Sequence, residues 1–393
     1  MRLQTQRTID NYVGRIGIAA LRPAAMLLGV VLRRDHSLSL DKEVVWIKML
    51  GGGSLLLAMP MLVGFKRSHP DVKMVLITTP SVKPFAEMMG VFDEYRTVSP
   101  RNAGTLVSSS LRALLKTLRA DCIVDLEVHS RLTTVFTTLT MARNRVSFWL
   151  EDIFWRRGLA SHLVFFNGSS GSYHFYDRIS ALFGTEIARR EDVRATLFAA
   201  CDVASTVQRV QGQVCVGFAC SDLGQERMLD AKQWVQAFQS NLRPEHKIFQ
   251  FLGGPGDRAR ADEIIAEVQR AFPDLTFRNR CGERTLAQSV GVIAESTEFW
   301  GIDSGLLHLA RIAGLRCISF WGPTDPATRL RDWGLEESTH YRKIACSPCV
   351  HTTEMPPCRG DNRCIQGLFD EGASAPLGWT PIEYPRRRVR ASA

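Results

Sequence analysis

The residues best suited to chemistry in this chain are Asp303, Ser304, Gly305 and His308, which follow the apolar run 299–302. A strand is predicted to end there and a helix to begin. Asp303 and Ser304 are residue types that cap helices, Gly305 lets backbone amides approach a ligand, and His308 falls one turn inside the helix. Such a site suits a pyrophosphate, because the amides and the helix dipole offset its charge. The alternative is an ordinary helix cap with a buried, hydrogen-bonded histidine.

Further loops with polar or glycine residues follow other predicted strands. Asp257 closes a glycine-rich loop and offers a carboxylate to a ribose, Thr324 lies in a rigid Pro-containing turn, and Arg227 can bring a cation to a phosphate. Near the N-terminal end, Gly51, Gly52 and Gly53 form a tight strand-to-helix turn, although neither a dinucleotide fingerprint nor a P-loop is present. Each loop alone is ordinary, but their shared position at strand ends favours a nucleotide cleft.

The elements that must position these loops are short apolar runs alternating with helical stretches, which is typical of parallel sheets with crossover helices. One cycle begins at 43–50 and a second at 213–219. Residues 151–175 are aromatic and predicted to be irregular, and 186–212 are predicted to be a linker. The sequence therefore predicts an α/β protein with two doubly wound, Rossmann-like domains facing across a cleft, where ligands bind at the carboxyl ends of the strands.

Length and composition agree with two globular domains. The 393 residues are 45% apolar and 23% charged, which excludes a disordered, collagen-like or coiled-coil chain. The net charge of +9 indicates an anionic partner such as a phosphorylated ligand or an acidic membrane face. We expect no nucleic-acid partner, because no basic stripe with aromatic platforms and no reader module is present. Six scattered cysteines in apolar stretches indicate a reducing cytoplasm.

The first 40 residues are predicted to form a basic, membrane-associating segment. Up to residue 34, six arginines face a single acid, Asp10, and apolar positions repeat at helical spacing on both sides of Pro23. The break at Arg22 and Pro23 argues against a spanning helix, and no cleavage pattern follows. We predict an amphipathic helix pair on an anionic membrane surface. The alternative is a helix packed on the main body.

Taken together, these motifs resemble glycosyltransferase family 9, the ADP-heptose:lipopolysaccharide heptosyltransferases. The resemblance runs from about residue 43 to 365, and its most specific parts are IDSGLLHLA at 302–310 and FWGPTDP at 320–326. It implies a GT-B fold, a nucleotide-sugar donor held mainly by the second domain, inversion at the anomeric carbon and catalysis without a required cofactor. It also implies work on a lipid-linked saccharide at the cytoplasmic face of the inner membrane.

One position departs from the family pattern. Ser54 stands where the family carries an aspartate thought to be the general base, and a serine without a partner is a poor base. We predict that Glu127 deprotonates the acceptor hydroxyl, with His174 as second candidate. The alternative for Glu127 is a pair with Arg131 that only organises the cleft. The acceptor-binding residues implied by the resemblance are Gly52, Gly53 and Arg131.

Four cysteines near the C-terminal end have a spacing that suits a metal. Cys346, Cys349, Cys358 and Cys364 lie within 19 positions and begin with a CxxC pair. Four thiolates can hold a structural Zn²⁺. Disulfides or uninvolved thiols are the alternatives.

The sequence thus divides into the N-terminal segment 1–40, an acceptor-side domain 41–200, a nucleotide-sugar-binding domain 201–345 and a Cys-containing segment with a basic tail, 346–393. We expect an inverting glycosyltransferase that moves heptose from ADP-heptose onto lipopolysaccharide or a related lipid-linked saccharide. The alternatives are a GT-B transferase for another nucleotide sugar in capsule or exopolysaccharide synthesis, and a non-catalytic nucleotide-sugar-binding scaffold.

Overall fold

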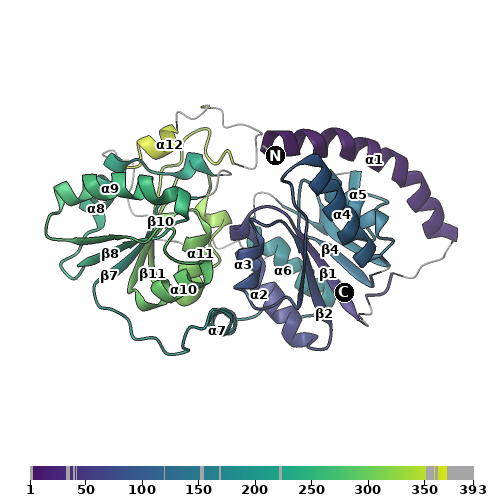
Figure 1. Cartoon of the computed structure of the whole chain (residues 1–393), viewed down its shortest axis with the longest axis horizontal. Coiled ribbons are helices and arrows are strands. Elements are labelled where there is room, and N and C mark those ends of the chain that lie inside the picture. The colour runs from purple at the N-terminus through teal and green to yellow at the C-terminus, as the bar shows by residue number, and fades with distance from the viewer. Residues whose placement is uncertain are drawn as a thin grey trace, which may run out of the picture.

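Two parallel sheets, each flanked by helices, form the body of the chain (Figure 1). The computed structural model describes residues 3–31, 36–38, 40, 42–118, 120–150, 155–167, 170–220, 224–350, 358 and 362–369. Both sheets have six strands, and every strand pair in them is parallel. The prediction of two doubly wound α/β halves is confirmed.

The first sheet has the order β3-β2-β1-β4-β5-β6. Its three most buried strands, β1, β2 and β4, are almost fully buried apolar runs, as parallel strands covered on both faces must be, whereas its two edge strands are partly exposed. The order reverses between β1 and β4, which opens a crevice at their carboxyl ends. The strands are β1 (Glu43–Lys48), β2 (Lys73–Thr78), β3 (Glu94–Thr97), β4 (Cys122–Asp125), β5 (Asn144–Trp149) and β6 (His162–Phe165). The helices are α2 (Gly52–Ser68), α3 (Lys83–Glu87), α4 (Ala103–Thr117), α5 (Arg131–Leu139) and α6 (Ser172–Phe183).

The second sheet has the order β12-β11-β10-β7-β8-β9 and reverses between β7 and β10. Aromatic residues such as Phe249, Trp300 and Phe320 fill its core. The strands are β7 (Gln213–Gly217), β8 (Ile248–Phe251), β9 (Thr276–Asn279), β10 (Glu298–Ile302), β11 (Arg316–Trp321) and β12 (Glu337–Tyr341). The helices are α8 (Ala231–Asn241), α9 (Arg258–Ala271), α10 (Leu286–Glu295), α11 (Gly305–Ala313) and α12 (Arg363–Gln366), with single 3-10 turns at Gln225–Arg227, Pro255–Asp257 and Pro326–Thr328.

Helix α2 joins the two halves. It is apolar on all sides and buried from Leu55 to Phe65, because it packs against α6 and α7 of its own half and against α11 of the other. A helix that is hydrophobic all round belongs inside a protein rather than at its surface. The N-terminal ends of α2 and α11 are thereby brought to the same place.

The stretch 186–212 connects the two halves and also contains a helix, whereas the prediction that 151–175 is irregular was wrong in part. That helix is α7 (Arg190–Ala200), whose apolar residues Val193, Leu197 and Phe198 are buried. The stretch 151–175, predicted to be irregular, contains the edge strand β6, which is only half-buried. Residues 151–154 lie outside the described part of the chain.

The N-terminal segment forms one helix, α1 (Leu3–Val31), rather than the predicted pair, and Pro23 lies inside it. The alternative expectation, a helix packed on the main body, is confirmed for one face of α1, which lies along α5 (Figure 1). Asp10 accepts hydrogen bonds from the Ser130 hydroxyl at 2.6 Å and the Leu132 amide at 2.9 Å. Within the described residues, no helix is long and apolar enough to cross a membrane.

Candidate functional site

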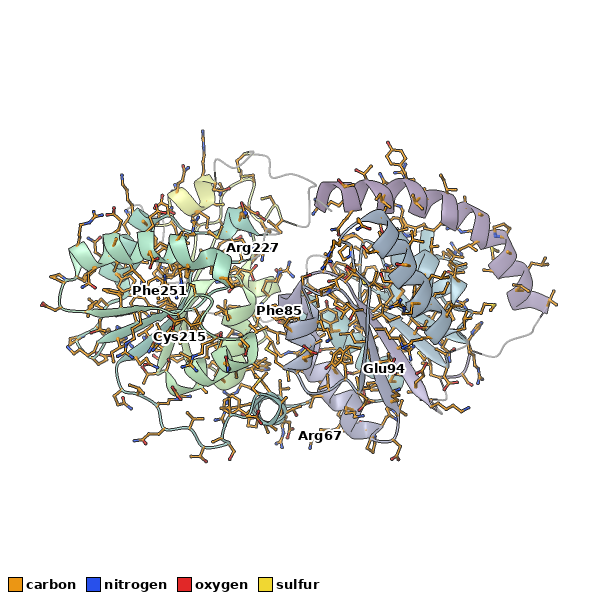
Figure 2. The ribbon with its side chains drawn as sticks, viewed as in Figure 1. Arg67, Phe85, Glu94, Cys215, Arg227 and Phe251 are labelled. Carbon is orange, nitrogen blue, oxygen red and sulfur yellow. The ribbon has the colours of Figure 1, made fainter. Side chains whose placement is uncertain are left out.

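The N-terminal ends of α2 and α11 meet at the junction of the two sheets. A Cβ on Gly53 would lie 3.6 Å from the Gly305 backbone nitrogen and 3.8 Å from the His308 ring. The Phe85 ring lies against both ends: a Cβ on Gly305 would come within 2.7 Å of it, and one on Gly52 would overlap it (Figure 2). A side chain at position 52 or 305 would therefore crowd Phe85, whereas a Cβ at position 53 would make ordinary van der Waals contact. Two helix ends with unpaired amide donors provide positive potential for an anion.

On the second-domain side, Asp303 is the centre of a buried charged cluster. Its Oδ2 atom lies 3.1 Å from the Arg227 guanidinium, which also donates to the Asp303 carbonyl at 3.2 Å. Burial alone would raise the pKa of Asp303, but Arg227 and Arg329 outweigh it and lower that pKa below its ordinary value. Asp303 is thus a carboxylate that pairs with Arg227 beside the N-terminal end of α11, with the charge of Arg329 close enough to lower its pKa.

Within the described residues, five buried polar atoms of this cluster lack a hydrogen-bond partner: Arg227 Nε, Asp303 Oδ2, Ser304 Oγ, His308 Nδ1 and Thr324 Oγ1. Ser304 is the N-cap residue of α11, yet the predicted side-chain cap is wrong, because its hydroxyl makes no cap hydrogen bond. Burial lowers the pKa of His308 to about 4, so the ring is neutral at pH 7. Buried polar groups are normally satisfied, so the Ser304 hydroxyl and the His308 ring have free capacity for a hydrogen bond within the described residues. Thr324, also buried, lies next to Asp303.

On the first-domain side, Glu127 forms a buried ion pair with Lys48, and not with Arg131 as one alternative expected. A single oxygen, Oε1, accepts from Lys48 Nζ at 3.1 Å and from the amides of Met49 and Leu50 at 2.7 and 2.9 Å. Burial by itself would lower the pKa of Lys48, but Glu127 raises it above its ordinary value. No hydrogen bond to the second carboxylate oxygen is formed by the described residues, so Oε2 remains available to accept a proton.

Ser54 is part of the same cluster. Its hydroxyl donates to the Gly51 carbonyl at 2.7 Å, and the buried Tyr176 of α6 lies nearby. Burial raises the pKa of Tyr176, against the lowering effect of nearby Lys48, so the phenol is neutral. Ser54 therefore positions the turn at Gly51, which has a φ of 76°, and has no basic partner that would activate it.

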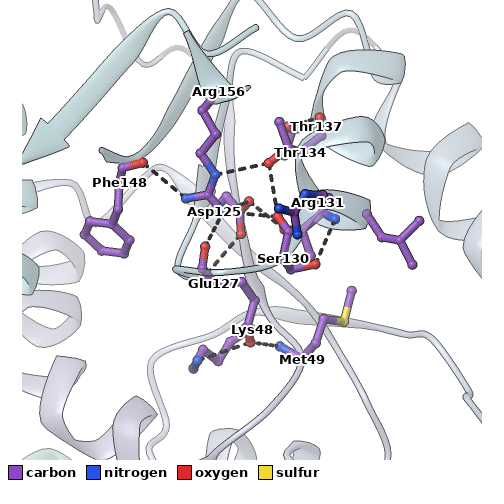
Figure 3. A network of polar contacts seen from close by, with 12 residues as sticks. Lys48, Met49, Asp125, Glu127, Ser130, Arg131, Thr134, Thr137, Phe148 and Arg156 are labelled. Atoms are coloured by element: carbon purple, nitrogen blue, oxygen red, sulfur yellow. Dashed lines mark hydrogen bonds and ion pairs between the residues drawn. The ribbon is translucent and has the colours of Figure 1, made fainter. Parts of the chain in front are cut away.

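A second buried ion pair fixes the loop that carries Glu127 (Figure 3). Arg156 Nη2 lies 3.4 Å from Asp125 Oδ2 and also donates to the Glu127 carbonyl. Asp125 in turn accepts from the Thr133 hydroxyl at 2.7 Å and from the Glu127 amide at 3.0 Å. Burial raises the pKa of Asp125 to about 6 despite Arg156. The network holds the end of β4 and the start of α5 in one conformation.

Three predicted site residues have other surroundings. Asp257 accepts from the Gly254 amide at 2.8 Å and so closes its own loop. Arg131 stacks over the Trp155 ring, 4.0 Å from its centroid, on the side of α5 that faces α1. His174 is exposed, with its ring against Tyr173, and has no contact with Glu127 or Ser54 within the described chain.

The expected zinc site is not formed in this structure. Within the described residues, no three His, Cys, Asp or Glu side chains are close enough to hold a metal ion. Cys349 and Cys364 are buried, Cys358 is half-buried and Cys346 is exposed, and all four are free thiols. Residues 351–357 and 359–361, which connect them, lie outside the described part of the chain, as do residues 370–393 of the basic tail.

Three residues of the site were missed by the sequence analysis: Lys48, Tyr176 and Arg329. Arg329 donates to the Ser172 hydroxyl of α6 at 2.8 Å and so connects the turn after β11 to the first half. A lysine in the otherwise apolar run 43–50 was the available signal for Lys48. The assembled site contains three cations (Lys48, Arg227 and Arg329), two carboxylates (Glu127 and Asp303) and two helix N-terminal ends. That excess of positive charge suits a diphosphate.

Comparison with solved structures defines the class of protein. The fold matches an ADP-heptose lipopolysaccharide heptosyltransferase II from E. coli with a TM-score of 0.57 and 14% identity, covering 84% of this chain and 100% of that one. An E. coli heptosyltransferase solved with ADP matches with a TM-score of 0.57 and 13% identity, covering 76% and 92%. Two doubly wound domains in this arrangement make the chain a GT-B protein.

Sequence comparison gives the family. Residues 204–358, which include the second sheet, match the model for glycosyltransferase family 9 (heptosyltransferase). A lipooligosaccharide heptosyltransferase 2 from Campylobacter jejuni is 25% identical over 128 residues. That match covers 31% of this chain and 39% of the relative, so the chain matches less than half of the relative's length. The resemblance predicted from the motifs is confirmed.

Proposed function

We propose that this chain is an inverting glycosyltransferase that moves a sugar from a nucleotide diphosphate donor, ADP-heptose, onto lipopolysaccharide or a related lipid-linked saccharide. The observation that supports the proposal most is the meeting of two helix N-terminal ends beside three cations, where Ser304 Oγ and His308 Nδ1 have no hydrogen-bond partner among the described residues. The match of residues 204–358 to the family model supports the reaction class. The heptosyl donor is proposed by analogy with the named relatives.

The donor diphosphate is proposed to lie at the N-terminal end of α11. The Gly305 amide and the Ser304 hydroxyl would donate to its oxygens, and Arg227 and Arg329 would offset the charge that develops as the diphosphate departs. Arg227 is held in place by Asp303, and Arg329 by Ser172. The neutral His308 ring can hydrogen-bond a phosphate or sugar oxygen without adding charge.

The acceptor hydroxyl is proposed to approach from the first domain, beside Gly52 and Gly53. Glu127 is the proposed general base, since Lys48 and two amides fix one of its oxygens and leave the other available. Proton transfer to a carboxylate typically contributes 10²- to 10⁴-fold in rate. Ser54 and His174 are left out of this step, because neither has a partner that would activate it toward the acceptor.

The reaction is proposed to take place at the cytoplasmic face of the inner membrane, where the lipid-linked acceptor would be reached. A transfer assay with ADP-heptose, UDP- and GDP-sugars against a lipid A–core acceptor tests the assignment. We expect turnover with ADP-heptose and inversion at the anomeric carbon. If only another nucleotide sugar supports transfer, that sugar is the donor and ADP-heptose is not. Binding of ADP without transfer from any donor would favour a nucleotide-sugar-binding scaffold.

A further inference from the structure

The exposed apolar side chains of this protein gather on the first domain. Among the described residues, all but two of the exposed large apolar side chains lie between Tyr12 and Phe165, and only Ile187 and Val210 follow. The largest groups are on α1 and α4, with a smaller one at the β5–β6 edge that includes Trp149 and Phe165. The members on α1 and α4 are Tyr12, Val13, Ile16, Met26, Leu27, Leu28, Val31, Val107, Leu111 and Leu115.

Helix α4 carries an apolar stripe that faces away from the sheet. Val107, Leu111 and Leu115 are four residues apart, so they lie on one side of the helix, and they are 66%, 52% and 60% exposed. Its opposite side carries the buried Ala113 and Thr117. A surface helix normally turns its apolar stripe inward. Since α4 already has an inward face, the outer stripe requires a partner of its own.

Helices α1 and α4 lie on the same side of the first sheet. Ala113 of α4 and Phe136 of α5 pack on the same sheet face, which includes Val45 and Ile47, and α1 covers α5 (Figure 1). Contacts between α1 and α5 are close because α1 has glycines there: a Cβ on Gly14 would overlap the Arg131 Cβ. Helices α1 and α4 are therefore held on the same side of one folded domain, and α1 is not a detached tail.

The charges around this surface are of one sign. Helices α1, α4 and α5 contain a single acidic residue, Asp10, and its carboxylate is occupied at the N-terminal end of α5. Exposed basic residues flank the apolar positions: Arg7 and Arg15 on α1, and Arg112 and Lys116 on α4. An apolar face bordered by cations is complementary to the interface of a bilayer with anionic headgroups. Another protein or a second copy would have to bring its own acidic rim, and this charge pattern favours the bilayer.

We propose that the outer faces of α1 and α4 together form a docking surface for an anionic lipid bilayer, which would seat the first domain on the membrane as a rigid unit. The inference deepens the proposed function, because it states how the acceptor-side domain would meet a lipid-linked saccharide. It goes beyond an N-terminal anchor, since it assigns a lipid contact to α4, a crossover helix of the sheet. The surface lies on the bilayer and does not span it.

Co-sedimentation of the full chain with sonicated vesicles tests the surface. Vesicles of phosphatidylethanolamine with about one third phosphatidylglycerol are compared with phosphatidylcholine vesicles. Each basic residue near an anionic surface contributes about a fivefold increase in affinity, so Arg112→Glu with Lys116→Glu should weaken binding at least 20-fold. The matched control is Lys232→Glu with Lys247→Glu, two exposed basic residues of the second domain, which should stay within about twofold of the unaltered chain.

The apolar stripe is tested separately. Leu111→Ser with Leu115→Ser should weaken vesicle binding about tenfold or more, whereas Ile187→Ser with Val210→Ser, which changes exposed apolar residues elsewhere, should leave it unchanged. Circular dichroism melts verify that each variant folds. The proposal would be overturned if the α4 variants bound vesicles as tightly as their matched controls. It would also be overturned if the unaltered chain bound the two kinds of vesicle equally. A concentration-dependent dimer that Leu111→Ser with Leu115→Ser abolishes would overturn it too, because a second copy would then cover the stripe.

Failure of this proposal and failure of the proposed function can be told apart. Transfer to a delipidated, water-soluble core saccharide depends on the cleft and needs no membrane. We expect the α4 variants to keep that activity within about twofold while losing transfer to acceptor embedded in vesicles. Loss of both activities in folded α4 variants would contradict the docking surface, since it would mean that α4 supports the cleft.

Discussion

Removing Arg227 is expected to weaken donor binding strongly. In the structure its guanidinium is only 17% exposed, lies 3.1 Å from Asp303 Oδ2 and is held at the N-terminal end of α11. Arg227→Ala removes one charge-assisted hydrogen bond to the diphosphate, worth about 2 kcal/mol. It also leaves the Asp303 carboxylate less well neutralised near the phosphates, which adds about 1 kcal/mol of repulsion in a partly solvated site. The sum of about 3 kcal/mol corresponds to a dissociation constant for ADP that rises about 150-fold.

Isothermal titration calorimetry with ADP measures this change directly. Arg270→Ala is the matched control, because that arginine pairs with Glu267 on the exposed side of α9 and should leave ADP affinity unchanged. Combining Arg227→Ala with Asp303→Asn should recover part of the loss, since the neutral amide no longer repels the phosphates. A dissociation constant within twofold of the unaltered chain would refute the placement of the diphosphate beside Arg227.

Four further outcomes follow from the site. Glu127→Gln should lower kcat 10²- to 10⁴-fold and leave the dissociation constant for ADP within threefold, and near-normal turnover would eliminate Glu127 as the base. Burial lowers the pKa of His308 to about 4, so the neutral ring contributes to the free energy of unfolding above pH 6.5, and this contribution is lost as the pH falls through 4. Urea unfolding at a series of pH values should show that His308→Gln removes up to about 3 kcal/mol of this pH dependence. Gly305→Ala should lower the free energy of unfolding in urea by about 1–3 kcal/mol, because the added methyl group crowds Phe85. Adding Phe85→Ala should recover most of this loss, and no recovery would show that the ring is not packed there. EDTA should leave turnover within twofold, since cations of the chain are proposed to supply the charge; activity that returns only with added Mg²⁺ would contradict this.

The alternation of strands and helices could be predicted because both sheets are parallel and buried on both faces. Their strands are therefore continuous apolar runs, such as Val44–Ile47, that stand out from the flanking helices. Strand β6 was missed because its apolar run, 163–166, is short and lies within a longer aromatic stretch that has no clear period. Helix α7 was missed because its buried residues, Val193, Leu197 and Phe198, are few within a charged stretch.

The candidate site could be predicted only in part. Asp303, Ser304 and Gly305 are local in sequence, so a strand-to-helix turn was enough to indicate them. The pairing of Lys48 with Glu127 could not be predicted, because 79 residues separate them and only the adjacency of β1 and β4 brings them together.

The function of the N-terminal segment shows the same limit. Its amphipathic pattern could be predicted, but its register against α5 could not, because that register depends on Asp10 capping a helix more than 100 residues away and on Gly14 permitting close approach. The exposed stripe of α4 has helical periodicity like any surface helix. Only the fold shows that this stripe points away from the sheet.

A crystal structure of the chain with ADP-heptose tests the central proposal most directly. The proposal predicts diphosphate oxygens within hydrogen-bond distance of the Gly305 amide and the Ser304 hydroxyl, with Arg227 and Arg329 beside them. A donor bound elsewhere, or a diphosphate held only by side chains away from the N-terminal end of α11, would contradict it.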